Sequence, residues 1–89
     1  MTVIHKYMVY PGPNSINIPE GAKFLSVHNQ NGNICLWALV NPSNKKEVRY
    51  IPLLGTGQLF HDDVNEYPFI GTVLVENFVW HVFDGGKLV

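Results

Sequence analysis

Two neighbouring residues, Asn31 and Gly32, constrain the fold of this chain more than any other feature of its sequence. They separate two runs rich in strand-forming residues, 24–29 and 34–40. A two-residue hairpin loop of type I′ needs positive φ at both central positions, and Asn and Gly adopt that conformation most readily. The sequence therefore predicts a β-hairpin centred on this dipeptide.

The pairing that follows from this loop makes the second strand of the hairpin apolar on both faces. The expected cross-strand pairs are Val27 with Leu36, Leu25 with Ala38, Ser26 with Trp37, and His28 with Cys35. A strand that is apolar on both faces belongs in the middle of a sandwich or a small barrel.

Turn residues recur along the rest of the chain and predict further short strands. These are expected at residues 3–10, 16–18, 47–54, 69–75 and 78–83. The last two form a second hairpin around Glu76 and Asn77, and Pro52 places its strand at an edge or introduces a bulge. Residues 84–89 are expected to form a loose tail. Without helical periodicity, the sequence predicts one all-β domain over 1–89, a small antiparallel β-sandwich or a partly open β-barrel built from hairpins.

The amino-acid composition indicates which kinds of partner to expect. Charged residues make up only 15% of the chain and hydrophobic residues 46%. A small domain with so few charged residues tends to associate with copies of itself or to bind a partner through one face. We therefore expect a homo-oligomer. Six basic residues against seven acidic ones, with only Lys45, Lys46 and Arg49 clustered, argue against binding to duplex nucleic acid.

Cys35 is the only cysteine, so the chain can form no internal disulfide and no cysteine-based zinc cage. Its position within the apolar run 34–40 suits a packed thiol in a reducing compartment. The first residues do not resemble a secretion signal, and no stretch approaches the roughly 18 apolar residues of a membrane span. Neither export nor membrane association is expected.

The segment 55–68 is the longest without a clear period, and long irregular loops are often functional. Phe60 offers an aromatic anchor beside polar groups that can set orientation. We predict a ligand or partner site here, formed by Thr56, Phe60, His61, Asp62 and Asp63. The alternative is that Leu59 and Phe60 only fill one end of a barrel and bind no partner.

A nucleotide site is a further possibility for the same loop. The run Gly55-Thr56-Gly57 lets backbone amides approach a phosphate, with Arg49 as the clamp and Trp37 or Trp80 as the stacking surface. If the loop is not the site, the corner formed by Lys45, Lys46 and Arg49 is the next candidate.

No residue pattern supports catalysis, a metal or a cofactor. His61, Asp62 and Asp63 are adjacent in the chain, and adjacent side chains seldom converge on one ion. No serine lies in a nucleophile elbow, and Cys35 is expected to be buried. We therefore predict a protein that is not an enzyme and that needs no metal or cofactor.

Several short motifs give the chain a resemblance to a known family. They are Ile4-His5-Lys6-Tyr7, Pro19-Glu20-Gly21-Ala22 before Leu25-Ser26-Val27, Leu36-Trp37-Ala38-Leu39-Val40, Gly55-Thr56-Gly57, Tyr67 before Ile70-Gly71-Thr72-Val73, and Trp80-His81-Val82-Phe83. The chain resembles a family of short proteins of unknown function found mostly in tailed phages and prophages. The resemblance implies an all-β fold and a phage context, and it assigns no catalytic residue.

Together these features predict a non-enzymatic phage accessory protein that acts in the host cytoplasm. It is expected to bind and neutralise a host defence component, either by sequestering a nucleotide immune signal or by blocking a defence protein. The alternative is a structural or virion-assembly protein that forms oligomers through its β-sheets.

Overall fold

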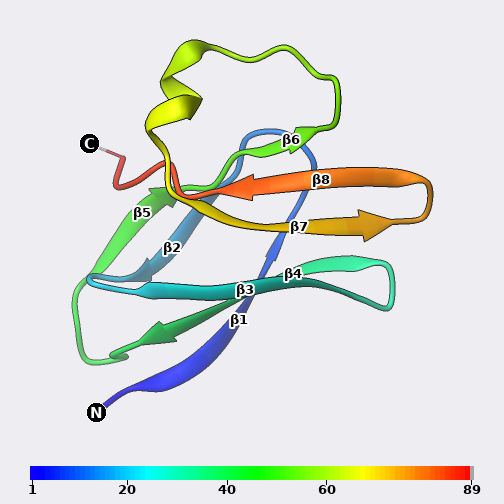
Figure 1. Cartoon of the computed structure of the whole chain (residues 1–89). Coiled ribbons are helices and arrows are strands. Elements are labelled where there is room, and N and C mark those ends of the chain that lie inside the picture. The colour runs from blue at the N-terminus through cyan, green and yellow to red at the C-terminus, as the bar shows by residue number, and fades with distance from the viewer. Residues whose placement is uncertain (89) are drawn as a thin grey trace.

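The computed structural model describes residues 1–88, without the side chain of Asp62. These residues form an antiparallel all-β fold, which confirms the predicted class (Figure 1). In chain order the strands are β1 (Val3–Val9), β2 (Ser15–Pro19), β3 (Lys23–Gln30), β4 (Asn33–Val40), β5 (Lys46–Tyr50), β6 (Leu53–Gly55), β7 (Phe69–Val75) and β8 (Phe78–Phe83). A short 3₁₀ helix (Asp62–Glu66) lies between β6 and β7.

The strands belong to three small sheets, with the orders β1-β4-β3, β2-β5 and β6-β8-β7. The described strands do not close into a barrel. In Figure 1 the β1-β4-β3 sheet lies at the bottom and the β6-β8-β7 sheet above it, with β3 and β7 running side by side. Within residues 1–88, no helix is long and apolar enough to cross a membrane.

The first predicted hairpin is confirmed. Asn31 and Gly32 have φ of 54° and 84°, as the type I′ turn requires. The predicted pairs Val27 with Leu36, Ser26 with Trp37 and His28 with Cys35 are present.

One predicted pair of this hairpin is wrong. Ala38 pairs with Phe24 rather than Leu25, because the register shifts between Phe24 and Ser26. A β-bulge inserts one extra residue opposite a single partner, and it turns Leu25 out of the regular alternation.

The second hairpin has the predicted bounds and register, with Val73 opposite Trp80 and Thr72 opposite His81. The predicted strand 47–54 is divided instead. β5 and β6 belong to different sheets, separated by the buried residues Ile51 and Pro52. Proline lacks the donor that would continue the ladder, so the chain leaves one sheet here and enters another.

The larger part of the core lies between the β1-β4-β3 and β6-β8-β7 sheets, and a smaller cluster of Ile18, Ala38 and Val40 joins β2 to β4. The main cluster contains buried residues from most of the strands and one residue from the segment between β5 and β6. These residues are Val9, Val27, Ile34, Leu36, Ile51, Leu53, Val73 and Val82. A backbone hydrogen-bond pair between Gly12 and Leu53 joins the turn after β1 to β6. This core fixes the relative positions of the two larger sheets.

The prediction of a loose tail is wrong for residues 84–88. The Tyr50 amide donates to the Gly86 carbonyl and the Gly85 amide donates to the Tyr50 carbonyl, while the Leu88 amide donates to Val48. The segment therefore pairs along β5. Gly85 and Gly86, which were expected to loosen the chain, instead let its backbone approach β5 closely. A Cβ built on Gly85 would overlap the Tyr50 ring. Val89 lies outside the described residues.

Candidate functional site

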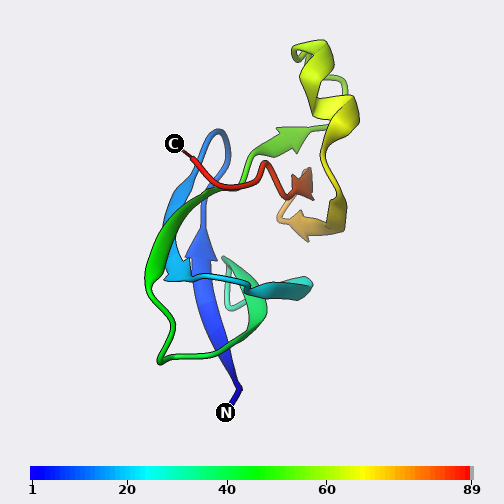
Figure 2. The ribbon, with the colours of Figure 1, turned by 90° about the vertical axis from the view of Figure 1, so that its left-hand side faces the viewer.

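The predicted binding residues fall into three separate parts of the structure. Thr56, Phe60, His61 and Asp63 lie on the connection between β6 and β7, together with the backbone of Asp62, whose side chain is outside the description. This connection projects from the body on the side opposite the β1-β4-β3 sheet, as Figures 1 and 2 both show. Trp37 lies on that sheet, in β4, and Arg49 lies on β5. The structure does not bring Trp37 to the loop.

Arg49 is held by two carboxylates. Its Nη1 lies 3.2 Å from Glu47 Oε2 and its Nη2 lies 2.6 Å from Asp84 Oδ2. The guanidinium also stacks on Phe24, 4.9 Å from the ring centroid. Only 12% of the side chain is exposed, and its Nε has no hydrogen-bond partner among the described atoms. The group therefore has little free charge to offer a phosphate.

Thr56 is oriented by a histidine. His81 Nε2 lies 2.8 Å from the Thr56 hydroxyl, and its Nδ1 lies 3.0 Å from the Thr72 hydroxyl. A threonine hydroxyl can donate or accept, so each can pair with the ring nitrogen that faces it. This arrangement ties the beginning of the loop to the β6-β8-β7 sheet.

The loop exposes apolar side chains at its tip. Leu59 is 96% exposed, and it lines a shallow hollow of about 410 Å³ together with Phe60 and His61. The 3₁₀ helix after this tip is braced by a hydrogen bond of 3.2 Å from the Tyr67 hydroxyl to Asp63. Burial raises the pKa of the Tyr67 phenol above its usual value, and the bond to Asp63 and the charge of that carboxylate raise it further.

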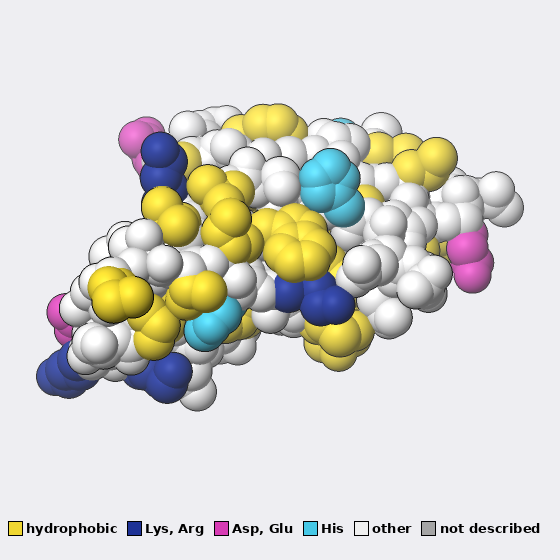
Figure 3. Space-filling model, turned by 90° about the horizontal axis from the view of Figure 1, so that it is seen from below, with side chains coloured by type: hydrophobic (Ala, Val, Ile, Leu, Met, Phe, Trp, Pro, Cys, Tyr) yellow, Lys and Arg dark blue, Asp and Glu magenta, His cyan; other side chains and the backbone are white. Residues whose placement is uncertain are grey.

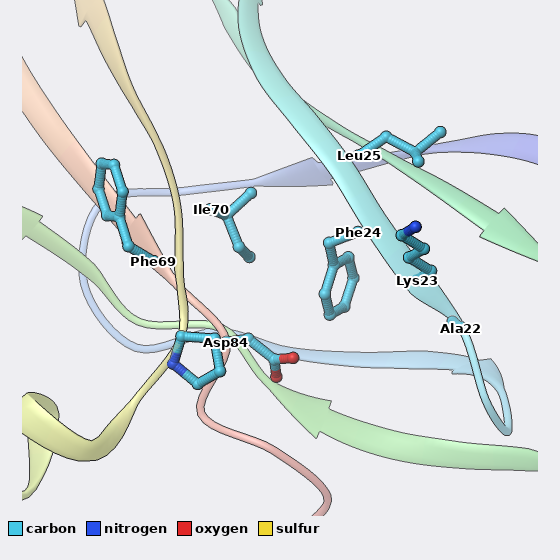
Figure 4. Close-up of a pocket in the computed structure, with 8 residues that line it drawn as sticks. Ala22, Lys23, Phe24, Leu25, Phe69, Ile70 and Asp84 are labelled. Atoms are coloured by element: carbon cyan, nitrogen blue, oxygen red, sulfur yellow. The ribbon is translucent and has the colours of Figure 1, made fainter.

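A second hollow of similar volume lies where β3 and β7 diverge, and we name it the β3–β7 cleft. It has a volume of about 420 Å³ and is lined by Ala22, Lys23, Phe24, Leu25, Pro68, Phe69, Ile70 and Asp84. Figure 4 shows Phe24 from β3 and Ile70 from β7 on either side of the space, with Asp84 beneath them. Six of the eight lining residues are apolar, but polar atoms, including those of Lys23 and Asp84 or of the backbone, form more than half of the surface that lines the cleft.

Two β-bulges face each other at this cleft. The register of β3 shifts between Phe24 and Ser26, and that of β7 shifts between Phe69 and Gly71. Further along, the strands are in contact, because Val27 packs against the backbone of Gly71 and the side-chain Nδ2 of Asn29 donates to the Leu74 carbonyl. No backbone hydrogen bond joins β3 to β7 among the described residues. The cleft is thus the open end of an unpaired seam between two edge strands.

The sequence prediction missed this cleft, although the sequence carries a trace of it. Phe24-Leu25 and Phe69-Ile70 are adjacent apolar pairs near the start of β3 and β7, although Val73-Leu74-Val75 interrupts the alternation of β7 as well. Such a pair breaks the period of two, and a bulge is the usual cause. Only the tertiary structure shows that the two bulges lie opposite each other.

The cleft is suited to binding. Asp84 is already engaged, since Oδ2 accepts from Arg49 and Oδ1 accepts from the Gly86 amide. Lys23 takes part in none of the ion pairs of the described residues. Among the described side chains, no group of three or more His, Cys, Asp or Glu is placed to hold a metal ion. An exposed aromatic, Phe69, and an ammonium group beside a hollow of mixed polarity are features that binding sites commonly have.

The structure is that of an antiparallel all-β protein with an open cleft between two edge strands. The chain belongs to a family described as a domain of unknown function (DUF7352), which matches residues 1–88. The resemblance to a family of unknown function is confirmed in this respect, and the phage context stays a prediction. No curated protein and no solved structure matches the chain.

Proposed function

We propose that this chain is a non-enzymatic binding protein that takes part of a host defence protein into the β3–β7 cleft and blocks it. The observation that carries the proposal is the cleft itself, a hollow of about 420 Å³ with both apolar and polar lining between two edge strands that are not paired with each other. The defence target and its setting in the host cytoplasm rest on the resemblance to phage proteins. Phe69, 58% exposed, is the anchor offered to the partner.

A protein target is favoured over a nucleotide signal by the state of the predicted nucleotide-binding residues. A phosphate clamp needs a cation with free donors, whereas both terminal nitrogens of Arg49 already face carboxylates. Of the two predicted stacking residues, Trp37 lies on a sheet remote from Thr56. Trp80 does pair with Gly55 and lines a small hollow with Thr56, so the preference for a protein target depends on Arg49. We further propose that the two larger sheets act as the layers of a small sandwich that is open along this cleft.

The test is a plaque assay in bacteria that each carry one defence system, with and without the expressed chain. The wild-type chain should restore plating of a phage that one of these systems blocks. Phe69→Ser should lose this effect. Leu74→Ser is the matched control, because Leu74 is 59% exposed on the same strand and lies outside the cleft. A folded wild-type chain that relieves no system would refute the proposal.

The nucleotide branch is tested separately by thermal-shift measurements with cyclic oligonucleotides and ADP-ribose derivatives. A shift that survives Phe69→Ser would move the function to a nucleotide and away from the cleft.

A structural role in the virion is the second candidate, and one observation favours it. The side of the β1-β4-β3 sheet that faces away from the core is apolar and is not covered by any described strand (Figure 3). Mass spectrometry of purified virions distinguishes the two functions. Stoichiometric amounts of the chain in particles would favour the structural role, and its absence would exclude that role.

A further inference from the structure

The uncovered side of the β1-β4-β3 sheet, which we name the outer face, combines apolar side chains with positive charge. Along β4, Trp37 and Leu39 alternate with residues buried in the core, and Ile4 and Lys6 of β1 pair opposite Leu39 and Trp37. Ile4 is 56% exposed. The Lys6 ammonium lies 5.8 Å from the centroid of the Trp37 ring. The outer face therefore offers an aromatic side chain with a cation beside it.

No carboxylate belongs to this sheet. The three strands contain two lysines and two histidines but neither Asp nor Glu. Figure 3 views the molecule from this side, and it shows hydrophobic side chains gathered in a band with Lys and His among them, while Asp and Glu occur only at the margins. An occupant of this face should carry apolar side chains and negative charge.

The chain itself carries such a surface. Between residues 50 and 86 there is no Lys or Arg, and the acidic residues there include Asp63 and Glu66 on the loop. Both of these side chains are exposed, and they follow the exposed tip formed by Leu59 and Phe60. A leucine that is 96% exposed gains about 2 kcal/mol or more when an apolar surface covers it. The loop tip thus has both properties that the outer face requires.

We propose that this protein associates head to tail, with the loop tip of one copy docked on the outer face of a second copy. The inference goes beyond the proposed function, which uses the β3–β7 cleft. Pairing two outer faces with each other would bring Lys6 and Lys23 of both copies together without a carboxylate between them, and like charges across an interface are unfavourable. Docking the loop tip brings opposite charges together and covers both apolar surfaces.

The two surfaces lie on opposite sides of the molecule, as Figures 1 and 2 show. One pair of copies therefore leaves a loop tip free at one end and an outer face free at the other. Such heterologous contacts propagate into a ring or an open chain rather than a closed twofold dimer. The assembly should accordingly grow with concentration beyond the dimer mass.

Sedimentation velocity of the full chain over a concentration series tests the association. The wild type should gain mass with concentration, and added salt should reduce this gain because the charges are exposed. Leu59→Ser should weaken association about tenfold or more, as expected for the loss of a central anchor. Leu74→Ser, an equally conservative change at an exposed leucine outside both surfaces, should leave it unchanged.

Charge exchange between the two surfaces gives a sharper test. One variant combines Lys6→Glu with Lys23→Glu, and the other combines Asp63→Lys with Glu66→Lys. Each variant alone brings like charges together and should remain monomeric. An equimolar mixture restores opposite charges at each contact and should associate again.

A wild type that remains monomeric up to its solubility limit would overturn the proposal, as would a mixture that fails to associate while circular dichroism shows both variants folded. Association that is insensitive to Leu59→Ser and to both charge variants would overturn it as well. Because Phe69 lies on neither surface, the plaque assay with Phe69→Ser is independent of these outcomes. Lys23 pairs opposite Leu39 at the edge of the outer face and also lines the cleft, so the variant with Lys6→Glu and Lys23→Glu is used for sedimentation alone.

Discussion

Asp84 Oδ2 accepts a hydrogen bond of 2.6 Å from Arg49 Nη2, and this pair fastens the segment after β8 to β5. Glu47 shares the same guanidinium from two residues away on β5. The three side chains are mostly buried, so each depends on the others for compensation of its charge. The C-terminal segment is thereby part of the folded structure, and the wall of the β3–β7 cleft is built on it.

Replacing Asp84 by Ala should destabilise the protein by about 3 kcal/mol, because it removes one carboxylate and leaves the buried Arg49 charge undercompensated. Urea unfolding followed by tryptophan fluorescence measures the change. Lys45→Ala, at an exposed position, is the control and should stay within about 0.5 kcal/mol of the wild type. Equal midpoints for the two variants would show that the ion pair contributes little.

Gly71→Ala should cost about 1–3 kcal/mol, because a Cβ at this position would lie 2.8 Å from Val27 Cγ1. The same substitution in a Val27→Ala background should cost much less, since the obstructing methyl group is gone. A double-mutant cycle in urea measures the coupling. If the free-energy costs of the two substitutions simply add, Gly71 and Val27 are not in close contact.

The second hairpin turn should be improvable. Glu76 has φ of 56°, a left-handed conformation that is unfavourable for glutamate and easier for asparagine. Glu76→Asn should therefore stabilise the protein by about 0.5–1 kcal/mol, measured as a higher denaturation midpoint. Gly32→Ala at the first turn, where φ is 84°, should instead destabilise the protein. Destabilisation by Glu76→Asn would contradict this account of the turn.

Tyr67 should titrate above the usual tyrosine range, because burial and the neighbouring Asp63 both raise its pKa. A raised folded-state pKa means that the contribution of this group to stability is complete below about pH 10 and is lost as the pH rises through the folded-state value. NMR of ¹³Cζ-labelled tyrosine follows the titration. Asp63→Asn should lower the pKa of Tyr67 and leave that of Tyr7, which burial alone raises, unchanged. An unaltered Tyr67 titration in this variant would exclude the role of Asp63.

Much of the local structure could be read from the sequence. The dipeptides Asn31-Gly32 and Glu76-Asn77 mark both tight hairpins, and the register on either side follows from the loop length. Of the predicted binding residues, Thr56, Phe60, His61 and Asp63 do lie on one projecting loop, because they are neighbours in the chain. Whether that loop binds a partner stays a prediction.

Only the tertiary structure decided which residues that are distant in sequence come into contact. The sequence by itself determined which segments become strands, because alternation and turn preference act over a few residues. It contained no local signal that Arg49 would meet Asp84, 35 positions later, or that Phe24 and Phe69 would line one cleft. Such pairings depend on how the sheets pack around a shared core, and many registers of packing are compatible with the same strand pattern. The tail illustrates the difference, since residues that are turn-forming in isolation become ordered once β5 lies beside them.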